Sequence, residues 1–304
     1  MRFTIYQESR IGSRQTNQDR IAYCYSRDAL LMLVADGMGG HEHGDLAAQL
    51  AVQHITQAFQ RAAQPALADP PLFLSKALTD AHYAIIDDSF ERHLNEAPRT
   101  TIVACVIQDG QAWWAHAGDS RLYLVRNRKL LTRTRDHSRL QLMLDQGLVS
   151  PEEAATHPGR NRIYSCLGGS HTPQIDYSLP HLLRDGDIFA LCSDGLWGPL
   201  EESDLIARLS SMPLAQAVPV LLDRAELDSA GTSDNLSLLA MCWHSSPGSV
   251  PNDSISTRTM ALDAFATQMD VGTASSTRVV DLDEDEIERA IREINDAISK
   301  FDKR

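Results

Sequence analysis

Apolar residues near the start of the chain recur with two different periods. Short apolar runs over residues 3–8 and within 21–35 predict strands. A segment beginning near Asp45 then carries apolar residues at spacings of four, three and four, which predicts a helix with Asp45 as its N-cap. The apolar face of this helix consists of Ala48, Val52, Ile55 and Phe59. Prolines end it, and a second helix follows with Leu74, Leu78, Ala81 and Ile85 on one face.

Strand-like patterns crowd together in the middle of the chain. They predict strands over residues 101–107, 112–117 and 121–125. Asp109-Gly110 lies between the first two and is typical of a tight hairpin turn. This part of the chain is therefore expected to form neighbouring antiparallel strands.

The following segment, 136–170, is polar and irregular, and Pro151 is expected to open a short helix within it. Two further predicted strands, 187–192 and 235–243, flank a helical stretch near 201–228. Strands joined by hairpins and helices in pairs do not show the regular alternation of a parallel sheet. The pattern favours an α+β fold in which antiparallel sheets carry helices on the outside.

The composition changes after Trp243. Residues 245–280 are rich in Ser, Thr, Asp, Pro and Gly, and predict a flexible linker between a catalytic domain over 1–244 and a terminal element over 281–304. That element is an amphipathic helix whose apolar positions are Ile287, Ile291, Ile294, Ile298 and Phe301. It could pack on the domain, pair with its own copy or bind a protein partner, and the sequence leaves these alternatives open.

Charge and composition narrow the range of partners. The chain has 304 residues and a formal net charge of −13, which argues against nucleic acid or an anionic membrane as the main partner. No apolar run approaches the roughly 18 residues of a membrane span, and no signal-peptide pattern opens the sequence. We therefore expect a cytoplasmic protein. None of its cysteines precedes an arginine by six positions, so the loop of a cysteine-dependent phosphatase is absent.

Three aspartates stand in similar surroundings: Asp36 and Asp194 follow apolar strands, and Asp234 lies in a glycine-containing turn. A carboxylate at the end of a buried strand is costly to desolvate unless a cation compensates its charge. Oxygen ligands without a histidine or cysteine cluster favour Mg²⁺ or Mn²⁺ over zinc. For each aspartate alone a turn or helix-capping role is the alternative, but the three together favour a metal site.

We expect these three carboxylates to hold one ion. The carbonyl of Gly37 and a bridging oxygen of Asp36 would begin a second site. Two ions about 3.5–4 Å apart lower the pKa of a water between them from about 15.7 towards neutrality, which supplies a nucleophile without a covalent intermediate. The pattern therefore predicts a hydrolase with two metal ions.

From about residue 8 to 243 the chain resembles the metal-dependent serine/threonine protein phosphatases of the protein phosphatase 2C type, in their bacterial form. The matching motifs are Arg14-Gln15-Thr16-Asn17-Gln18-Asp19, Asp36-Gly37-Met38-Gly39-Gly40-His41, Thr100-Thr101, Gly118-Asp119-Ser120-Arg121, Asp136-His137-Ser138, Leu167-Gly168, Ser193-Asp194-Gly195-Leu196-Trp197 and Ser233-Asp234-Asn235. Each motif alone would be weak, but their number and order make the resemblance specific.

The resemblance implies a β-sandwich of two antiparallel sheets flanked by pairs of helices, with metals in a cleft at one end. The residues that match the binuclear metal ligands are Asp36, Gly37, Asp194 and Asp234. Asp19 matches a carboxylate beside the second ion, and Asp119 matches the ligand of a third, weaker site. Arg14 matches the arginine that binds the phosphate, for which a surface salt bridge is the alternative.

Several positions depart from the family pattern. Gln18 replaces a glutamate, and Met38 replaces the histidine proposed to protonate the leaving group. His41 is a candidate general acid in its place, with a purely structural or water-binding role as the alternative. Arg99 stands where a glycine is usual, and the sequence gives no reason for it. The stretch 140–170 matches a variable flap beside the cleft.

The predicted function is hydrolysis of phosphoserine and phosphothreonine in proteins, by a hydroxide bridging two Mg²⁺ or Mn²⁺ ions. The implied partners are phosphoprotein substrates and a cognate serine/threonine kinase. An aspartyl-phosphate mechanism is disfavoured because it needs a second aspartate where Met38 stands. The remaining alternative is a phosphatase-like regulatory or binding protein that acts through its C-terminal helix.

Overall fold

Two antiparallel sheets form the centre of the computed structural model, which describes residues 1–38, 43–150, 153, 157, 159, 162–245 and 266–270. The first sheet has the order β1-β13-β12-β7-β8. Its strands are β1 (Phe3–Arg10), β7 (Arg121–Arg126), β8 (Lys129–Arg133), β12 (Ile188–Cys192) and β13 (Leu236–Trp243).

The second sheet has the order β10-β6-β5-β3-β2-β14, with β11 also paired to β6. Its strands are β2 (Asp19–Tyr25), β3 (Ala29–Asp36), β5 (Ile102–Gln108), β6 (Gln111–Ala117), β10 (Asp176–Tyr177), β11 (His181–Leu182) and β14 (Ala266–Asp270). A separate short pair joins β4 (Arg99–Thr100) to β9 (Leu167–Gly168).

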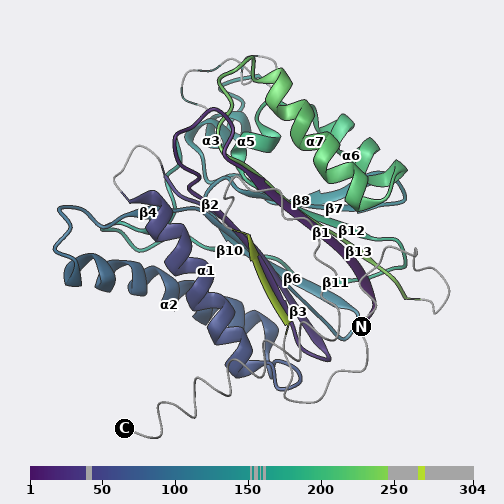
Figure 1. Cartoon of the computed structure of the whole chain (residues 1–304), viewed down its shortest axis with the longest axis horizontal. Helices are drawn as coiled ribbons and strands as arrows, with labels where there is room; N and C mark the ends of the chain where they lie inside the picture. Colours follow the sequence, from purple (N-terminus) through teal and green to yellow (C-terminus); the bar gives the residue numbers. More distant parts are fainter. Residues whose placement is uncertain are drawn as a thin grey trace, which may run out of the picture. The chain divides into compact units, whose positions relative to one another are not determined.

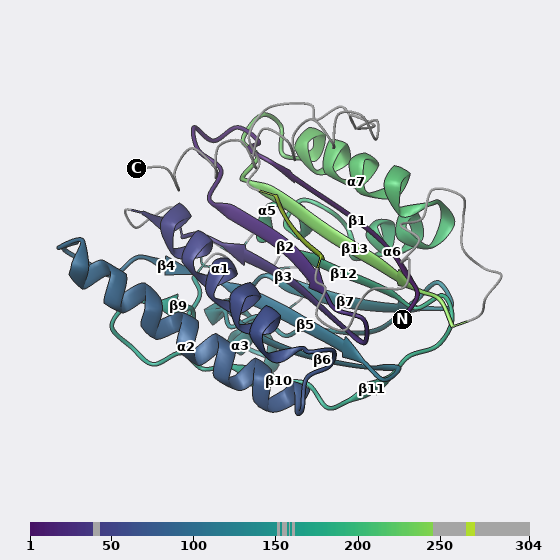
Figure 2. The same cartoon turned by 60° about the horizontal axis from the view of Figure 1, so that its bottom comes forward.

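Helices cover the outer face of each sheet, as Figures 1 and 2 show. The second sheet carries α1 (Gly44–Ala62) and α2 (Pro70–Glu91), and the first carries α6 (Glu202–Ser211) and α7 (Leu214–Asp228). Two shorter helices, α3 (Arg139–Asp145) and α5 (Asp194–Trp197), lie in the connections. The predicted α+β fold with antiparallel sheets between helices is confirmed. Of the described helices, none has the length and apolar character needed to cross a membrane.

The sequence of β3 is apolar throughout because the strand is buried on both faces. Its residues alternate between two cores, because successive side chains of a strand point to opposite faces of the sheet. Leu30 and Met32 belong to the core between the two sheets, whereas Leu31 and Leu33 pack with α1 and α2. A strand buried on both faces therefore loses the usual alternation of polar and apolar residues.

The predicted hairpin is confirmed in detail. Strands β5 and β6 pair antiparallel up to Gln108 and Gln111, and the two turn residues, Asp109 and Gly110, have φ angles of 51° and 69°. Positive φ at both central residues is the requirement of the tight turn that suits twisted strands.

Two local expectations need correction, and a third is not tested. Helix α1 begins at Gly44 after His43, so Asp45 lies in the first turn, where its charge favours the helix dipole, and is not the N-cap. Helix α3 forms inside the stretch expected to be irregular, because Ser138 caps it by accepting a hydrogen bond from the Gln141 N–H at 3.1 Å. The helix expected to open at Pro151 falls on residues that are mostly outside the described part.

The segment expected to be a linker contains a strand. Ala266–Asp270 pairs antiparallel with β2, placing Ala266 opposite Tyr25 and Asp270 opposite Ile21. The backbone of this strand pairs with the otherwise free edge of β2. The residue pattern of 266–270 did not predict a strand. The amphipathic helix predicted over 283–302 lies outside the described residues.

Candidate active site

Two aspartates face each other where β2 begins and β3 ends. Asp19 is the first residue of β2 and Asp36 the last of β3, and the antiparallel register pairs them directly. The side chain of Asp19 is fully buried, and Asp36 is half-buried. Like charges at opposed positions of neighbouring strands are unfavourable without a compensating cation.

Three further aspartates lie at the same end of the sandwich. Asp119 follows β6, Asp194 follows β12, and Asp234 stands just before β13. Because β12 pairs antiparallel with both β7 and β13, the end of β12 lies beside the start of each of these strands. The strand ends therefore bring aspartates from both sheets together.

The pKa values show how strongly these carboxyls affect one another. Burial raises the pKa of Asp19 to about 7, although a hydrogen bond from Ser193 opposes the shift, and the charges of Asp194 and Asp234 add to it. Burial, followed by the charges of Asp19 and Asp194, raises the pKa of Asp36 well above its ordinary value. This electrostatic environment favours binding of a cation.

The donor atoms fit hard divalent ions. Asp19 accepts a hydrogen bond from Ser193 Oγ at 2.6 Å through Oδ2, while its buried Oδ1 has no hydrogen-bond partner among the described residues. An unpaired buried carboxylate oxygen needs a ligand, and the neighbouring acidic groups offer oxygen only. The cluster therefore suits Mg²⁺ or Mn²⁺, as the sequence predicted.

Arg14 does not stand free in this arrangement. Its guanidinium donates to both oxygens of Asp234, from Nε at 2.8 Å and from Nη2 at 2.7 Å. The salt bridge considered as the alternative for Arg14 is thus present, and its partner is a predicted metal ligand. No three of the clustered aspartates among the described residues offer oxygens that all lie within 4.8 Å of one another. An ion bound by Asp234 would therefore have to compete with Arg14 for that carboxylate.

Gly37 is required by a close approach of two backbone segments. A Cβ at this position would lie 2.2 Å from the carbonyl oxygen of Gly44. The Gly37 N–H also donates to the Gln18 carbonyl at 3.2 Å, which ties the end of β3 to the residue before Asp19. Its proposed role as a carbonyl ligand stays a prediction. His41 lies outside the described residues, so its role as general acid stays a prediction as well.

The Thr-Thr pair, noted in the sequence without a role, anchors Asp36. The backbone N–H of Thr101 donates to the Asp36 carbonyl at 2.8 Å, and Thr100 Oγ1 donates to the same oxygen at 2.9 Å. The Asp36 N–H in turn donates to Thr101 Oγ1 at 3.2 Å. These bonds fix the backbone of Asp36 at the end of its strand.

A second network supports Asp119, and sequence reasoning missed it. Arg121 forms two hydrogen bonds with Asp136, at 2.8 and 2.7 Å, and its guanidinium lies 3.5 Å from the centroid of a Trp197 ring. Trp197 Nε1 donates to the Asp119 carbonyl at 2.9 Å. The motifs that contain Arg121, Asp136 and Trp197 thus all help to position Asp119. In the sequence, the only common feature of these motifs was a charged or aromatic residue.

A cleft of about 470 Å³ adjoins the aspartates. Its lining residues are Arg14, Asp194, Gly195, Trp197, Gly198, Pro199, Asp228, Ser229, Thr232 and Asp234. A phosphorylated side chain entering this cleft would meet Arg14 and two of the predicted metal ligands together.

Arg99 is partly explained by its backbone. Its carbonyl accepts a hydrogen bond from the Met38 N–H at 3.0 Å, which holds the turn after Asp36. Any residue could supply this carbonyl, so nothing in the structure explains why an arginine stands here.

Comparison with known proteins agrees with this geometry. The sequence pattern of the family described as Protein phosphatase 2C matches residues 6–227, well over half of the chain. "Protein phosphatase PhpP" of Streptococcus pneumoniae serotype 2 (strain D39 / NCTC 7466) is 33% identical over 238 residues, which cover 75% of this chain and 92% of that protein. "Serine/threonine phosphatase stp" of Listeria monocytogenes serotype 4b (strain F2365) is 31% identical over 230 residues, covering 74% and 90%.

Solved structures show the same similarity. The serine/threonine phosphatase PstP/Ppp of Mycobacterium tuberculosis has a TM-score of 0.71 and 30% identity, covering 80% of this chain and 99% of its own. A catalytic domain of PstP, solved in complex with two manganese ions, has a TM-score of 0.66 and 28% identity, covering 79% and 97%.

Proposed function

This chain belongs to the protein phosphatase 2C family of bacterial serine/threonine phosphatases, and from that premise we propose that it hydrolyses phosphoserine and phosphothreonine in proteins with the help of two divalent ions. The observation that carries the proposal is the convergence of Asp19, Asp36, Asp119, Asp194 and Asp234 at one end of the sandwich.

Each residue has a proposed part in the reaction. Asp36, Asp194 and Asp234, with the Gly37 carbonyl, would hold the two ions, and Asp119 would add a ligand for a third. Asp19, whose Oδ1 has no hydrogen-bond partner within the described part of the chain, would offer this oxygen to the second ion. When bound, two such ions would supply a water of lowered pKa as the nucleophile.

Arg14 would bind the phosphate. Its planar guanidinium can donate two parallel hydrogen bonds to phosphate oxygens, as it does here to the two oxygens of Asp234. Once Asp234 turns to a cation, Arg14 is released towards the cleft. The same residue then compensates the negative charge that builds up on the phosphoryl group.

The wider setting of the reaction belongs to the same proposal. The family of this chain suits phosphoprotein substrates, Mn²⁺ or Mg²⁺ as the ions and a cognate serine/threonine kinase, and the proposed location is the cytoplasm. His41 remains the proposed general acid. The alternative, a regulatory or binding protein that acts through its C-terminal helix, would not hydrolyse phosphoproteins.

Metal removal and one ligand substitution test the proposal. We expect the purified chain to hydrolyse a phosphothreonine peptide with Mn²⁺ and to lose this activity in EDTA. Asp194→Asn should lower kcat by at least about 100-fold, the scale on which loss of one electrostatic catalytic group is felt. The control is Asp204→Asn, which changes a surface partner of Arg208 in α6. Activity that persists in EDTA, or that survives in the Asp194 variant, would contradict the proposal.

A further inference from the structure

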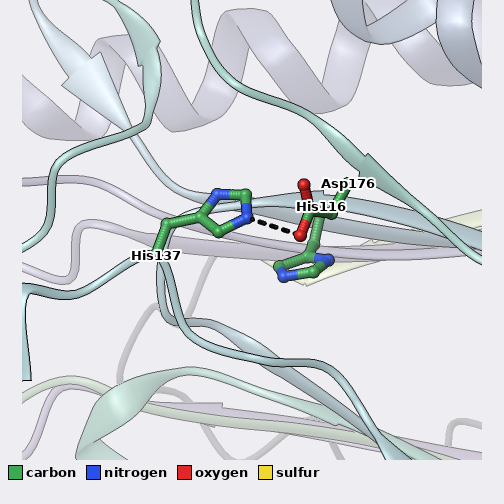
Figure 3. Close-up of side chains that lie close together, drawn as sticks. All are labelled: His116, His137 and Asp176. Atoms are coloured by element: carbon green, nitrogen blue, oxygen red, sulfur yellow. Dashed lines mark ion pairs between the residues drawn. The ribbon is translucent and has the colours of Figure 1, made fainter. Parts of the chain in front are cut away.

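A second cluster of potential metal ligands lies away from the aspartates. The side-chain ligand atoms of His116, His137 and Asp176 all lie within 4.8 Å of one another. His116 is on β6, Asp176 is its direct partner on β10, and His137 precedes α3. Figure 3 shows the ring of His137 directed at the Asp176 carboxylate, with the ring of His116 beside it.

The two imidazoles are buried, and His116 carries an unpaired nitrogen within the described part of the chain. His116 is 4% exposed and His137 is 1% exposed. Within the described part of the chain, His116 Nδ1 has no hydrogen-bond partner. His137 Nε2 lies 3.3 Å from Asp176 Oδ2. Buried polar atoms without partners are rare, and a bound ligand is one physical reason for them.

The hydrogen bond at His116 Nε2 leaves the lone pair of Nδ1 available for a cation. Its Nε2 lies 2.8 Å from the Arg135 carbonyl, which can only accept, so Nε2 carries the proton and Nδ1 has a free lone pair. Histidine ligands typically donate their other N–H to a carbonyl in this way, which fixes the ring orientation. Burial, with the nearby His137, lowers the pKa of His116.

The two rings also lie close together. Their centroids are 4.6 Å apart with an angle of 29° between the ring planes. Small movements of Asp176, which is half-exposed, would complete the set.

We propose that His116, His137 and Asp176 form a site for a divalent transition-metal ion such as Zn²⁺, separate from the aspartate site. Two imidazoles and one carboxylate are ligands that zinc and its neighbours bind well, whereas Mg²⁺ prefers oxygen alone. Water would complete the coordination, because three protein ligands leave one position of a tetrahedral ion open.

Ion binding moves one proton on His137. In the structure its Nδ1 accepts from the Gly118 N–H at 3.4 Å, so the neutral ring carries its proton on Nε2. When the ion takes Nε2, the proton moves to Nδ1 and the Gly118 contact is given up. Two N–H donors would then face each other, so ion binding also requires the His137 ring or the Gly118 backbone to shift until both find acceptors.

The test measures zinc retention by the full chain in excess Mg²⁺, which occupies oxygen sites and competes poorly for histidine. Wild-type protein should retain one Zn²⁺ after dialysis, and Zn²⁺ should raise its Tm. His116→Gln and the half-exposed Asp176→Asn should each weaken zinc binding by at least about 100-fold, since even loss of a supporting group costs 10–100-fold.

The matched control is His181→Asn, a histidine on β11, which pairs with the same strand β6. It should retain zinc as the wild type does. The Asp176 variant keeps the test decisive if His116→Gln does not fold. Failure of the wild type to retain zinc overturns the proposal, as does equal retention by wild type and the Asp176 variant. Loss of phosphatase activity alone would bear on the aspartate site and not on this one.

Discussion

At the residue scale, Arg14, the predicted phosphate-binding residue, pairs directly with Asp234, a predicted metal ligand. A carboxylate engaged by a guanidinium through both oxygens cannot also bind a cation well, and the guanidinium cannot bind phosphate. Both side chains are partly exposed, at 57% and 38%, so the pair contributes no more than about 1 kcal/mol. A contact this weak can give way when an ion and a phosphate arrive.

Arg14→Ala should therefore have opposite effects on two affinities. The KM for a phosphothreonine peptide should rise about 10-fold or more, because a charged hydrogen-bonding group of this kind contributes at least about 1.4 kcal/mol to phosphate binding. Affinity for Mn²⁺ should stay equal or improve by up to about fivefold, because Asp234 loses its competitor. Steady-state kinetics and a Mn²⁺ titration measure the two.

Arg27→Ala is the control for this variant, since Arg27 pairs with Asp28 on the surface. It should change neither quantity. If Arg14→Ala left KM unchanged, Arg14 would have no part in phosphate binding. If it weakened Mn²⁺ binding, the competition argued here would be wrong.

At the scale of elements, the carboxylates are held by contacts between strand ends and loops that come from distant parts of the chain. The buried pair of Arg121 and Asp136 joins the start of β7 to the loop before α3, with side chains 14% and 6% exposed. The guanidinium then packs on Trp197 of α5, which binds the backbone of Asp119. Loss of one partner would leave a buried charge and disturb all three elements.

Asp136→Asn should accordingly destabilise the protein by about 3 kcal/mol, the usual result of breaking a buried ion pair on one side. Urea unfolding measures this change. The exposed pair of Asp204 and Arg208 supplies the control, and Asp204→Asn should cost less than about 0.5 kcal/mol. Equal effects of the two substitutions would show that the Arg121 network contributes no special stability.

At the scale of the whole molecule, β14 changes where the catalytic unit is expected to end. Residues Met1–Thr273 group as one unit, and within it β14 covers β2, the strand that begins with Asp19. An uncovered strand edge exposes unpaired N–H and C=O groups, which favours association with other chains. The boundary predicted at residue 244 would leave this edge free.

Two truncations distinguish the boundaries. A chain ending at Thr273 should keep full phosphatase activity and stay monomeric to the same degree as the full chain. A chain ending at Ser245 should lose solubility or Tm because the β2 edge is exposed. Size-exclusion chromatography and thermal unfolding measure both, and identical behaviour of the two truncations would mean that β14 contributes nothing to the fold.

The residue patterns by themselves determined the elements whose periodicity is local. The apolar spacing from Ala48 to Phe59 predicted α1, and Asp109-Gly110 predicted the hairpin between β5 and β6. Both predictions succeeded because helix faces and tight turns depend on neighbours a few residues apart. Asp36, Asp194 and Asp234 could be singled out because each breaks an apolar or glycine-containing pattern.

Only the tertiary structure decided what these residues meet. The pairing of Arg14 with Asp234, the packing of Arg121 on Trp197 and the meeting of His116 with His137 all join residues far apart in the chain. The sequence showed no histidine cluster because its members are separated along the chain. Such contacts depend on sheet order and strand register. Packing on both faces of the sheets fixes the order and register, and no local pattern of residues predicts them.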